Sequence, residues 1–321
     1  MPTVEPRVHT SIIIVSYNTR EMTLACIRSV LDQAKSDDFE IIVLDNASTD
    51  GSAAALREEF GTQIRLFAHE DNVGFAGGNN LAAEHAQGEF LLLLNPDTVV
   101  LDHAIDRLVA FSQEHPDAGI WGGRTVFEDG SLNPASCWRR TTLWSLLCQA
   151  CGFGRALRNS PVFNPEGYGG WPRDTIRRVD IVSGCFFLIR RDMWKKLEGF
   201  DLTYFMYGEE ADLCHRARAL GANPIVTPNA TIVHYGGASE KVRAEKVIRL
   251  FKAKSTLIRR HWVAWKVPFG IWLLSAWPLS RAFQFRISRI LGRTSESSKA
   301  WAEVWQRRRE WIGGYERPSH E

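Results

Sequence analysis

The stretch GEFLLLLNPDTVV, Gly88–Val100, joins a run of four leucines to a polar turn. The segment Glu89–Leu94 is almost entirely apolar, which is typical of a strand buried on both faces of a sheet. Asn95, Pro96 and Asp97 all favour turns, so an ordinary turn after a buried strand is one interpretation. The other is that the strand presents the Asp97 carboxylate at a fixed place at its C-terminal end.

Similar strands alternate with helical patterns through the first part of the chain. Four strands are expected, at Ser11–Ser16, Phe39–Asp45, Ile64–His69 and Glu89–Leu94. Strands separated by helices predict βαβ units and an α/β fold with a mostly parallel, Rossmann-like sheet and flanking helices. Ligands on such sheets bind outside the carboxyl ends of the strands. The polar residues at these four strand ends therefore define a candidate site.

Composition and charge divide the chain into two parts. The 321 residues are 45% hydrophobic and 24% charged, as expected for a globular protein. Residues 1–240 carry 21 Lys and Arg against 31 Asp and Glu, whereas residues 241–321 carry 18 against 6. An acidic body and a basic tail imply different roles. The N-terminal MPTVEPRVHT shows no apolar segment of a secretory signal, so a cytoplasmic location is expected.

Three common kinds of site are disfavoured. The first turn, SYNTR, lacks the G-x-G-x-x-G of dinucleotide-binding folds, and no G-x-x-x-x-G-K-[ST] phosphate loop occurs. Six cysteines are too few for a disulfide framework in a chain of this length, so reduced thiols are expected. Cys148 and Cys151 form CQAC, but no second pair accompanies it, which argues against a zinc or redox site.

Six motifs resemble the inverting family-2 type glycosyltransferases, most closely their bacterial rhamnosyltransferase branch. They are IIIVSYNTRE, IIVLDNASTDGS, NVGFAGGNN, LLLLNPDT, MYGEEADLCHRA and IVHYGG, and they cover residues 11 to about 237. One such motif would be weak, whereas six in one order argue strongly against chance. The resemblance implies a nucleotide-sugar-binding fold of the GT-A type and transfer of a sugar from a nucleoside-diphosphate donor.

The resemblance implies a divalent metal at the end of the fourth strand. In the family, a D-x-D motif there holds the metal on the donor diphosphate. Here the first position is Asn95, so Asp97 is the only full carboxylate and the site is less anionic. His234 in IVHYGG becomes a candidate metal ligand, although a lone His at a strand end is more often structural. Mg²⁺ or Mn²⁺ is expected, with an imidazole ligand favouring Mn²⁺.

The donor is expected to bind at the strand ends and in the Gly/Asn loop after the third strand. Tyr17 is expected to pack on the nucleoside base and Asp45 to bond the base or ribose, with a plain turn acid as the alternative for Asp45. The loop lets a nucleotide approach the backbone closely, although simple turn chemistry also explains its glycines. The predicted donor-binding residues are Ser16, Tyr17, Asn18, Asp45, Asn46, Asn72, Gly74, Asn79 and Asn95.

The resemblance assigns the catalytic base to Glu210. The family's acidic pair at a helix start corresponds to Glu209-Glu210, and the second residue takes the base role, with Glu209 as a neighbour that raises its pKa by like charge. The alternative is that acids in a first helical turn only complement the helix dipole. Asp212 and Arg216 lie four residues apart and are expected to pair on the same helix.

We expect a catalytic domain at 1–240, with a donor half at about 11–127 and an acceptor half at about 128–240, followed by a tail at 241–321. Residues 131–178 show no clear periodicity and are expected to form a partly ordered excursion near the site. Val179–Arg191 is expected to be one strand. The tail is expected to be helical and to associate with membrane.

Trp262–Leu279 is an apolar stretch of the tail that contains one lysine and two prolines. A helix packed in a protein core is one interpretation, and a membrane span is short of the roughly 20 apolar residues needed. Seven of the twelve tryptophans lie in residues 262–311, and arginines flank the stretch, which favours the interface of an anionic bilayer. No nucleic-acid-reading motif is found.

The expected function is metal-dependent, inverting transfer of a sugar, with rhamnose from dTDP-rhamnose favoured, to a hydroxyl of a glycan or lipid-linked acceptor in cell-surface polysaccharide synthesis. The enzyme is expected at the cytoplasmic face of the inner membrane. The alternatives are another donor, such as a UDP-sugar, and a catalytically silent, membrane-associated sugar-nucleotide-binding protein. A glycoside hydrolase is a third alternative. It needs two carboxylates on either side of a sugar site, but it does not require the polar strand ends typical of a nucleotide site.

Overall fold

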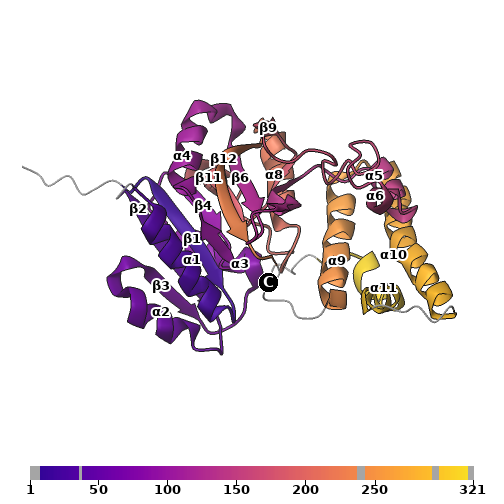
Figure 1. Ribbon diagram of the computed structural model, residues 1–321, viewed down its shortest axis with the longest axis horizontal. Helices are drawn as coiled ribbons and strands as arrows, with labels where there is room; N and C mark the ends of the chain where they lie inside the picture. The colour runs from indigo at the N-terminus through magenta and orange to yellow at the C-terminus, as the bar shows by residue number, and fades with distance from the viewer. Residues whose placement is uncertain (1–7, 36–37, 237–242, 291–295, 317–321) are drawn as a thin grey trace, which may run out of the picture. The chain divides into compact units, whose positions relative to one another are not determined.

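The structure, a computed structural model, describes residues 8–35, 38–236, 243–290 and 296–316 (Figure 1). The chain divides into two compact units. The first is drawn from Met1–Trp138, Pro172–Phe205 and Glu209–Ser239, and the second from Arg139–Trp171, Met206–Gly208 and Glu240–Glu321. Residues 139–171 thus group with the C-terminal segment rather than with the sequence around them. The functional division at residue 240 stays a prediction.

The first unit is built on a mixed sheet in the order β3-β2-β1-β4-β11-β6-β12-β5, with β7 on β6 and β9 on β12. Its strands are β1 (Thr10–Ser16), β2 (Phe39–Asn46), β3 (Arg65–His69), β4 (Phe90–Leu94), β5 (Thr98–Val100), β6 (Ile120–Val126), β7 (Leu132–Asn133), β9 (Arg177–Arg178), β11 (Phe186–Arg190) and β12 (Ile225–His234). β1 to β4 are mutually parallel, and β11 runs antiparallel to both β4 and β6. The predicted fold class, a mostly parallel α/β sheet with flanking helices, is confirmed.

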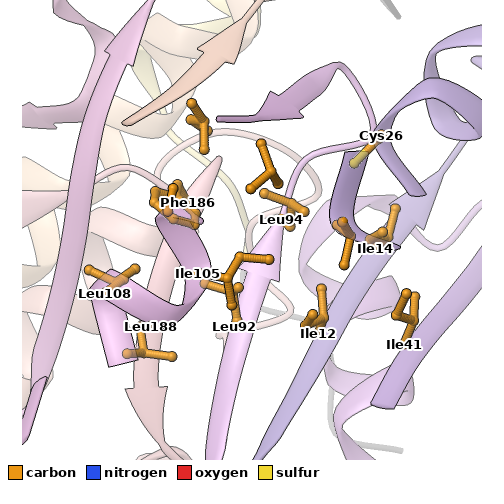
Figure 2. Packing of buried hydrophobic residues seen from close by; sticks show 14 of the residues in the cluster. Ile12, Ile14, Cys26, Ile41, Leu92, Leu94, Ile105, Leu108, Phe186 and Leu188 are labelled. Carbon is orange, nitrogen blue, oxygen red and sulfur yellow. The ribbon is translucent and has the colours of Figure 1, made fainter. Parts of the chain in front are cut away.

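Helices cover both faces of this sheet. They are α1 (Arg20–Gln33), α2 (Ser52–Phe60), α3 (Gly74–Glu84), α4 (Ala104–Glu114), α7 (Arg191–Lys196) and α8 (Glu209–Ala219). Strand pairing aligns Ile41, Ile12, Leu92 and Leu188 in one row across four strands. Figure 2 shows that row packed against side chains of α1 and α4, among them Cys26, Ile105 and Leu108. Every labelled residue in that view is buried, so this face of the sheet is a continuous core.

The other face of the sheet is packed closely by α3. A Cβ added at Gly78 would lie 2.7 Å from the Val15 side chain and 3.3 Å from that of Leu44. No larger residue fits there without moving the helix, because real Cβ contacts are longer. This close approach fixes the start of α3 over the C-terminal ends of β1 and β2.

One local prediction in the middle of the chain is wrong. Val179–Arg191 is not one strand: β10 (Ile181–Val182) pairs with β8 (Cys137–Trp138) in a separate small sheet, and β11 begins only at Phe186. The break falls at Gly184, where an added Cβ would lie 3.2 Å from the Phe75 ring. Within residues 131–178, expected to form a partly ordered excursion, the structure has two short helices, α5 (Leu143–Ala150) and α6 (Phe153–Ala156), and that the segment lies near the site stays a prediction.

The second unit is helical. With α5 and α6 it contains α9 (Arg243–His261), α10 (Val267–Ile290), α11 (Glu296–Gln306) and α12 (Arg309–Ile312), and α9, α10 and α11 pack on one another (Figure 1). Its core is the buried cluster Leu146, Ala244, Ile248, Phe251, Ile258, Leu273, Leu274, Val304 and Trp311. Phe251 contacts the rings of Trp277, Trp301 and Trp311. Among the residues that the structure describes, no helix combines the length and apolar character that a membrane crossing requires.

Candidate active site

The turn after β4 is held by backbone and hydroxyl contacts. The Asn95 amide donates to the Cys185 carbonyl at 3.1 Å, and the Thr98 hydroxyl donates to the Asn95 carbonyl at 2.7 Å. The backbone of the turn is therefore fixed by the neighbouring strand and by its own hydroxyl. The Asn95 side-chain oxygen is buried and has no hydrogen-bond partner among the described residues.

This turn brings Asp97 against His234. β5 pairs antiparallel with β12 so that Thr98 lies opposite His234, which puts the preceding residue, Asp97, beside the imidazole. The Asp97 Oδ1 lies 3.5 Å from the His234 Nε2, and the two residues are only 6% and 7% exposed. The Tyr235 amide also donates to the Asp97 carbonyl. Two residues far apart in sequence thus form one buried polar pair at a strand end.

The pair stabilises its charged forms. Burial alone would raise the pKa of Asp97, but the bond and charge of His234 outweigh burial and lower that pKa below its usual range. Burial alone would lower the pKa of His234, but Cys185 and Asp97 outweigh burial and raise that pKa to about 10. Without a metal the pair is therefore an imidazolium and a carboxylate.

The pair fits a divalent cation that shares its ligands with a diphosphate. Within the described residues, no group of three or more His, Cys, Asp and Glu is arranged to hold a metal. Mg²⁺ and related ions, however, are commonly held by one or two protein groups together with substrate phosphates and waters. Asp97 and His234 offer an oxygen and a nitrogen side by side, and the unpartnered Asn95 oxygen is a further donor in the same turn.

At the end of β2, Asp45 has one oxygen engaged and one available. Its Oδ2 accepts a hydrogen bond from the Ser48 amide at 3.2 Å, while its Oδ1 is buried without a partner in the described chain. A buried acceptor left unpaired costs about 1–3 kcal/mol, so such an atom marks a place where a ligand donor would be favourable. Tyr17 is 37% exposed, so its ring is accessible for stacking.

The loops around Asp45 are tied to one another. The Asn18 side-chain oxygen accepts a hydrogen bond from the Thr49 backbone N–H at 2.8 Å. The Asn18 backbone N–H donates to the Ser48 hydroxyl at 2.9 Å. Asn46 donates to the Asn72 side chain and to the Gly74 carbonyl, at 3.0 and 3.1 Å. The loops after β1, β2 and β3 therefore form one hydrogen-bonded rim.

Several predicted donor residues use their polar groups inside this rim. Ser16 is fully buried and bonds the Thr19 and Thr23 hydroxyls, and Asn79 is 1% exposed and donates to the Phe75 carbonyl. Asn46 is 2% exposed, with its amide groups engaged as described. These three shape the loops, and direct contact between any of them and a donor stays a prediction.

Gly74 sits where the rim meets a second loop. Its φ is +77°, and an added Cβ would lie 2.2 Å from the Phe205 carbonyl oxygen. That same oxygen accepts a hydrogen bond from the Phe75 amide at 2.9 Å. Only glycine combines this backbone conformation with this close approach.

Glu210 lies in the first turn of α8. Its Cβ is 3.9 Å from the position that a Cβ would take at Gly184, and the next residue, Cys185, bonds the Asn95 amide. The predicted base and the strand-end turn are thus connected through two adjacent residues. The predicted Asp212–Arg216 pair is confirmed at 2.6 Å, and Arg216 also donates to the Gly199 carbonyl, which anchors α8.

A family model described as glycosyl transferase family 2 matches residues 11–197, more than half of the chain. The chain belongs to glycosyl transferase family 2. This match contains both the predicted donor loops and the turn after β4, and the resemblance predicted from the six motifs is confirmed.

Curated relatives of this family 2 member include one protein named for O-antigen biosynthesis and two named as rhamnosyltransferases. It is 28% identical over 239 residues to the O-antigen biosynthesis protein RfbC of Myxococcus xanthus, covering 72% of this chain and 18% of that one. It is 25% identical over 223 residues to an N-acetylglucosaminyl-diphospho-decaprenol L-rhamnosyltransferase of Mycobacterium tuberculosis, covering 64% and 69%. It is 26% identical over 257 residues to the rhamnosyltransferase WbbL of Escherichia coli, covering 76% and 90%. The chain spans 18% and 27% of the first two relatives' lengths.

The fold has solved counterparts. A mannosyltransferase of Pyrobaculum calidifontis, solved with GDP-Man and Mn²⁺, superposes with a TM-score of 0.57 at 18% identity, covering 97% of this chain and 86% of that one. At this identity the likeness concerns the fold alone.

Sequence reasoning missed Phe75, Gly184 and Cys185 in this family 2 member. Gly184 and Cys185 connect Glu210 to Asn95, and Phe75 connects α3 both to Gly184 and to the Phe205 loop. The sequence contains one signal of this connection. Gly184 lies inside the strand-like run Val179–Arg191, and a glycine in such a run often marks a break or a close approach of backbones.

Proposed function

We propose that this chain is an inverting, divalent-metal-dependent glycosyltransferase that moves a sugar from a nucleoside-diphosphate donor to an acceptor hydroxyl. The observation that carries the proposal is the buried Asp97–His234 pair at the carboxyl end of the sheet, 3.5 Å apart. The unpartnered oxygens of Asn95 and Asp45 belong to the same set of strand ends. This is the place where open α/β sheets bind ligands.

The loop rim would hold the nucleoside. Asp45 Oδ1 would accept a hydrogen bond from the base or ribose, and Tyr17 would pack on the base. The bonds among Asn18, Asn46 and their neighbouring loops would keep these groups in place before the donor arrives. Such positioning reduces the entropy lost when the reacting atoms are aligned.

Asp97 and His234 would hold the metal, with Asn95 as a further oxygen donor. Bound there, Mg²⁺ or Mn²⁺ would neutralise charge on the leaving diphosphate. His234 would give up its proton on binding the cation, because an imidazole binds metal in its neutral form. Asp97 needs no such change, because its pKa is already lowered.

Glu210 would accept the proton of the attacking hydroxyl. Hydroxyl protons are weakly acidic, so a positioned base contributes typically ~10²–10⁴-fold. Attack on the face of the anomeric carbon opposite the diphosphate inverts its configuration. The anchored helix α8 would hold Glu210 on that side. Glu209, which is 4% exposed, would act as the neighbour that raises the pKa of Glu210 by like charge.

We favour L-rhamnose from dTDP-rhamnose as the donor and a lipid-linked or glycan hydroxyl as the acceptor, in cell-surface polysaccharide synthesis. Two of the relatives named above are rhamnosyltransferases, and one is named for a diphospho-decaprenol acceptor, which supports this choice. Such an acceptor resides in a membrane, so we place the enzyme on the cytoplasmic face of the inner membrane, with its basic second unit towards the lipid.

A thermal-shift screen tests the proposal. Unfolding temperatures are compared for dTDP-rhamnose, UDP-glucose and GDP-mannose, each with Mn²⁺ and with a chelator. A ligand at 100 times its Kd stabilises the native state by about 2.7 kcal/mol. We expect stabilisation by dTDP-rhamnose only when the metal is present. Stabilisation by UDP-glucose alone would make UDP-glucose the donor, and equal stabilisation by dTDP-rhamnose in the presence of the chelator would overturn the metal dependence. Donor binding without any transfer or hydrolysis would favour a silent binding protein.

A further inference from the structure

Helix α10 carries a row of large apolar side chains that face outward. The row, called here the α10 stripe, consists of Phe269, Trp272, Leu279, Phe283, Ile287 and Ile290. Spacings of three, four and seven residues place these side chains on one face of the helix. Their exposed fractions run from 45% to 84%, and Trp265, in the turn before the helix, is 62% exposed. Large apolar side chains exposed along one helix face in this way mark an interaction site.

The stripe is not the face that builds the helical unit. Leu273, Leu274 and Ala282 of the same helix are at most 8% exposed. Leu273 and Leu274 belong to the core cluster with residues of α5, α9 and α11. The inward face thus accounts for the packing of α10, and the outward stripe needs a separate partner.

The sequence segment that contains the stripe is basic. From Lys246 to Ser295 the chain has 11 Lys and Arg and no Asp or Glu. On α10 itself, Arg286 and Arg289 are exposed beside the last stripe residues. An anionic surface complements this charge, whereas a neutral apolar partner would not use it.

An apolar groove borders the beginning of the stripe. Its volume is about 570 Å³, and it is lined by Arg259, Ala264, Val267, Pro268, Ile271, Trp272 and Ser275. Trp272 belongs to both the groove and the stripe, so the apolar surface is continuous. Arg259 is exposed and is the charged residue of this lining. A long apolar chain with a negative headgroup matches that combination.

We propose that the α10 stripe lies in the interface of an anionic lipid bilayer, with α10 parallel to the surface. Such a helix buries its apolar face at the headgroup boundary while basic residues contact the headgroups. A second copy of this chain fits less well, because a two-fold contact along the stripe would place Arg286 and Arg289 of both copies in one interface, and α10 itself carries no Asp or Glu to pair with them. The proposal rests on the membrane association suggested above, and not on the sugar-transfer chemistry.

Sedimentation of the full chain with vesicles tests the proposal. Vesicles of phosphatidylcholine with phosphatidylglycerol are compared with vesicles of phosphatidylcholine alone. The stripe variant is Phe283→Ser with Ile287→Ser, which are 61% and 45% exposed. Its matched control is Leu157→Ser with Val162→Ser, which are 44% and 56% exposed in the same unit but outside α10. We expect at least about a tenfold loss of partitioning for the stripe variant and less than about a twofold loss for the control. The reason is that binding of an interfacial helix scales with the apolar area that it buries in the bilayer.

A second pair of variants separates charge from apolar area. Each basic side chain close to an anionic surface contributes roughly fivefold in partitioning. Arg286→Gln with Arg289→Gln should therefore lower binding to anionic vesicles by at least about tenfold. The control, Arg158→Gln with Arg309→Gln, removes two exposed charges of the same unit outside α10 and should lose less. Equal losses in both charge variants would overturn the assignment of Arg286 and Arg289.

Three outcomes would overturn the stripe itself. They are absence of vesicle binding by the wild type, equal binding to neutral vesicles, and equal losses in the stripe variant and its control. A wild-type dimer that the stripe variant dissociates, seen by analytical ultracentrifugation without lipid, would assign the stripe to self-association instead. Donor binding, measured separately by thermal shift, distinguishes failure here from failure of the proposed chemistry.

Discussion

His234 Nε2 lies 3.5 Å from Asp97 Oδ1 because β5 and β12 pair with Thr98 opposite His234. Neither side chain is placed by its own neighbours in sequence alone. The contact is a consequence of strand register, and a shift of one residue would turn one of the two side chains to the opposite face of the sheet. The metal assignment therefore depends on the fold as much as on the motif.

We predict that Asp97→Asn lowers transfer by at least about a thousandfold, because a metal supplies several kcal/mol of charge stabilisation. Mn²⁺ binding in the presence of nucleoside diphosphate, measured by calorimetry, should weaken in parallel. Asp129→Asn is the control, since that carboxylate is in an exposed hairpin turn and bonds the Ser131 amide. Wild-type turnover in Asp97→Asn would remove Asp97 from the metal site.

Asp97→Asn also leaves a buried imidazolium without its partner, which could lower activity through stability alone. The double variant Asp97→Asn with His234→Gln removes both charges and addresses this. We expect its unfolding temperature to recover relative to Asp97→Asn while transfer stays lost. Recovered transfer in the double variant would mean that the pair is structural.

We predict that Glu210→Gln lowers kcat by at least about a hundredfold, as expected for loss of a general base, with donor affinity unchanged. Steady-state kinetics with varied acceptor provide the measurement. Glu209→Gln serves as the comparison, because it removes a carboxylate from the adjacent position in the same helical turn. If Glu209→Gln is the crippling change and Glu210→Gln is mild, the base is Glu209.

We predict that Asp45→Asn weakens donor binding by about tenfold, the difference between a charged and a neutral acceptor. The saturated rate should stay close to that of the wild type, since Asp45 is expected to contact the nucleoside and not the reacting atoms. Asp71→Asn, an exposed acid in the loop after β3, is the control. A lowered unfolding temperature with unchanged donor affinity would indicate a turn acid that only bonds the Ser48 amide.

The sequence was sufficient to predict the fold class and the strand ends, because continuous apolar runs such as Phe90–Leu94 report burial directly. It also predicted the Asp212–Arg216 pair, which depends on local spacing alone. It could not predict that β11 would run antiparallel between β4 and β6, since nothing in Phe186–Arg190 specifies which strands it pairs with. The break at Gly184 was missed for the same reason, because it depends on the approach of the distant Phe75 ring.

For the candidate site, the sequence predicts which polar residues lie near the strand ends better than it predicts what each side chain binds. Asn46 and Asn79 are polar residues near strand ends, and the structure engages both in hydrogen bonds within the loops. Whether an amide faces a ligand or a backbone depends on side-chain direction, which sequence does not report. The segment 139–171 gave no periodic signal because its helices α5 and α6 are only eight and four residues long.

We predict that Gly74→Ala destabilises the first unit and weakens donor binding, because it combines two costs. Its φ of +77° is unfavourable for any residue with a Cβ, by roughly 1–2 kcal/mol. In addition, the new Cβ would lie 2.2 Å from the Phe205 carbonyl oxygen, so the rim or the Phe205 loop must move. Gly130→Ala is a matched control, since Gly130 has the same φ of +77° and open space around the Cβ position. Chemical denaturation should give a loss of about 1–2 kcal/mol for Gly130→Ala and at least about 2 kcal/mol more for Gly74→Ala, the scale of severe steric substitutions. Donor affinity should fall only in Gly74→Ala. Equal losses of stability in the two variants would show that the contact with Phe205 is relieved at no cost, and would remove Gly74 from the residues that hold the donor loop in place.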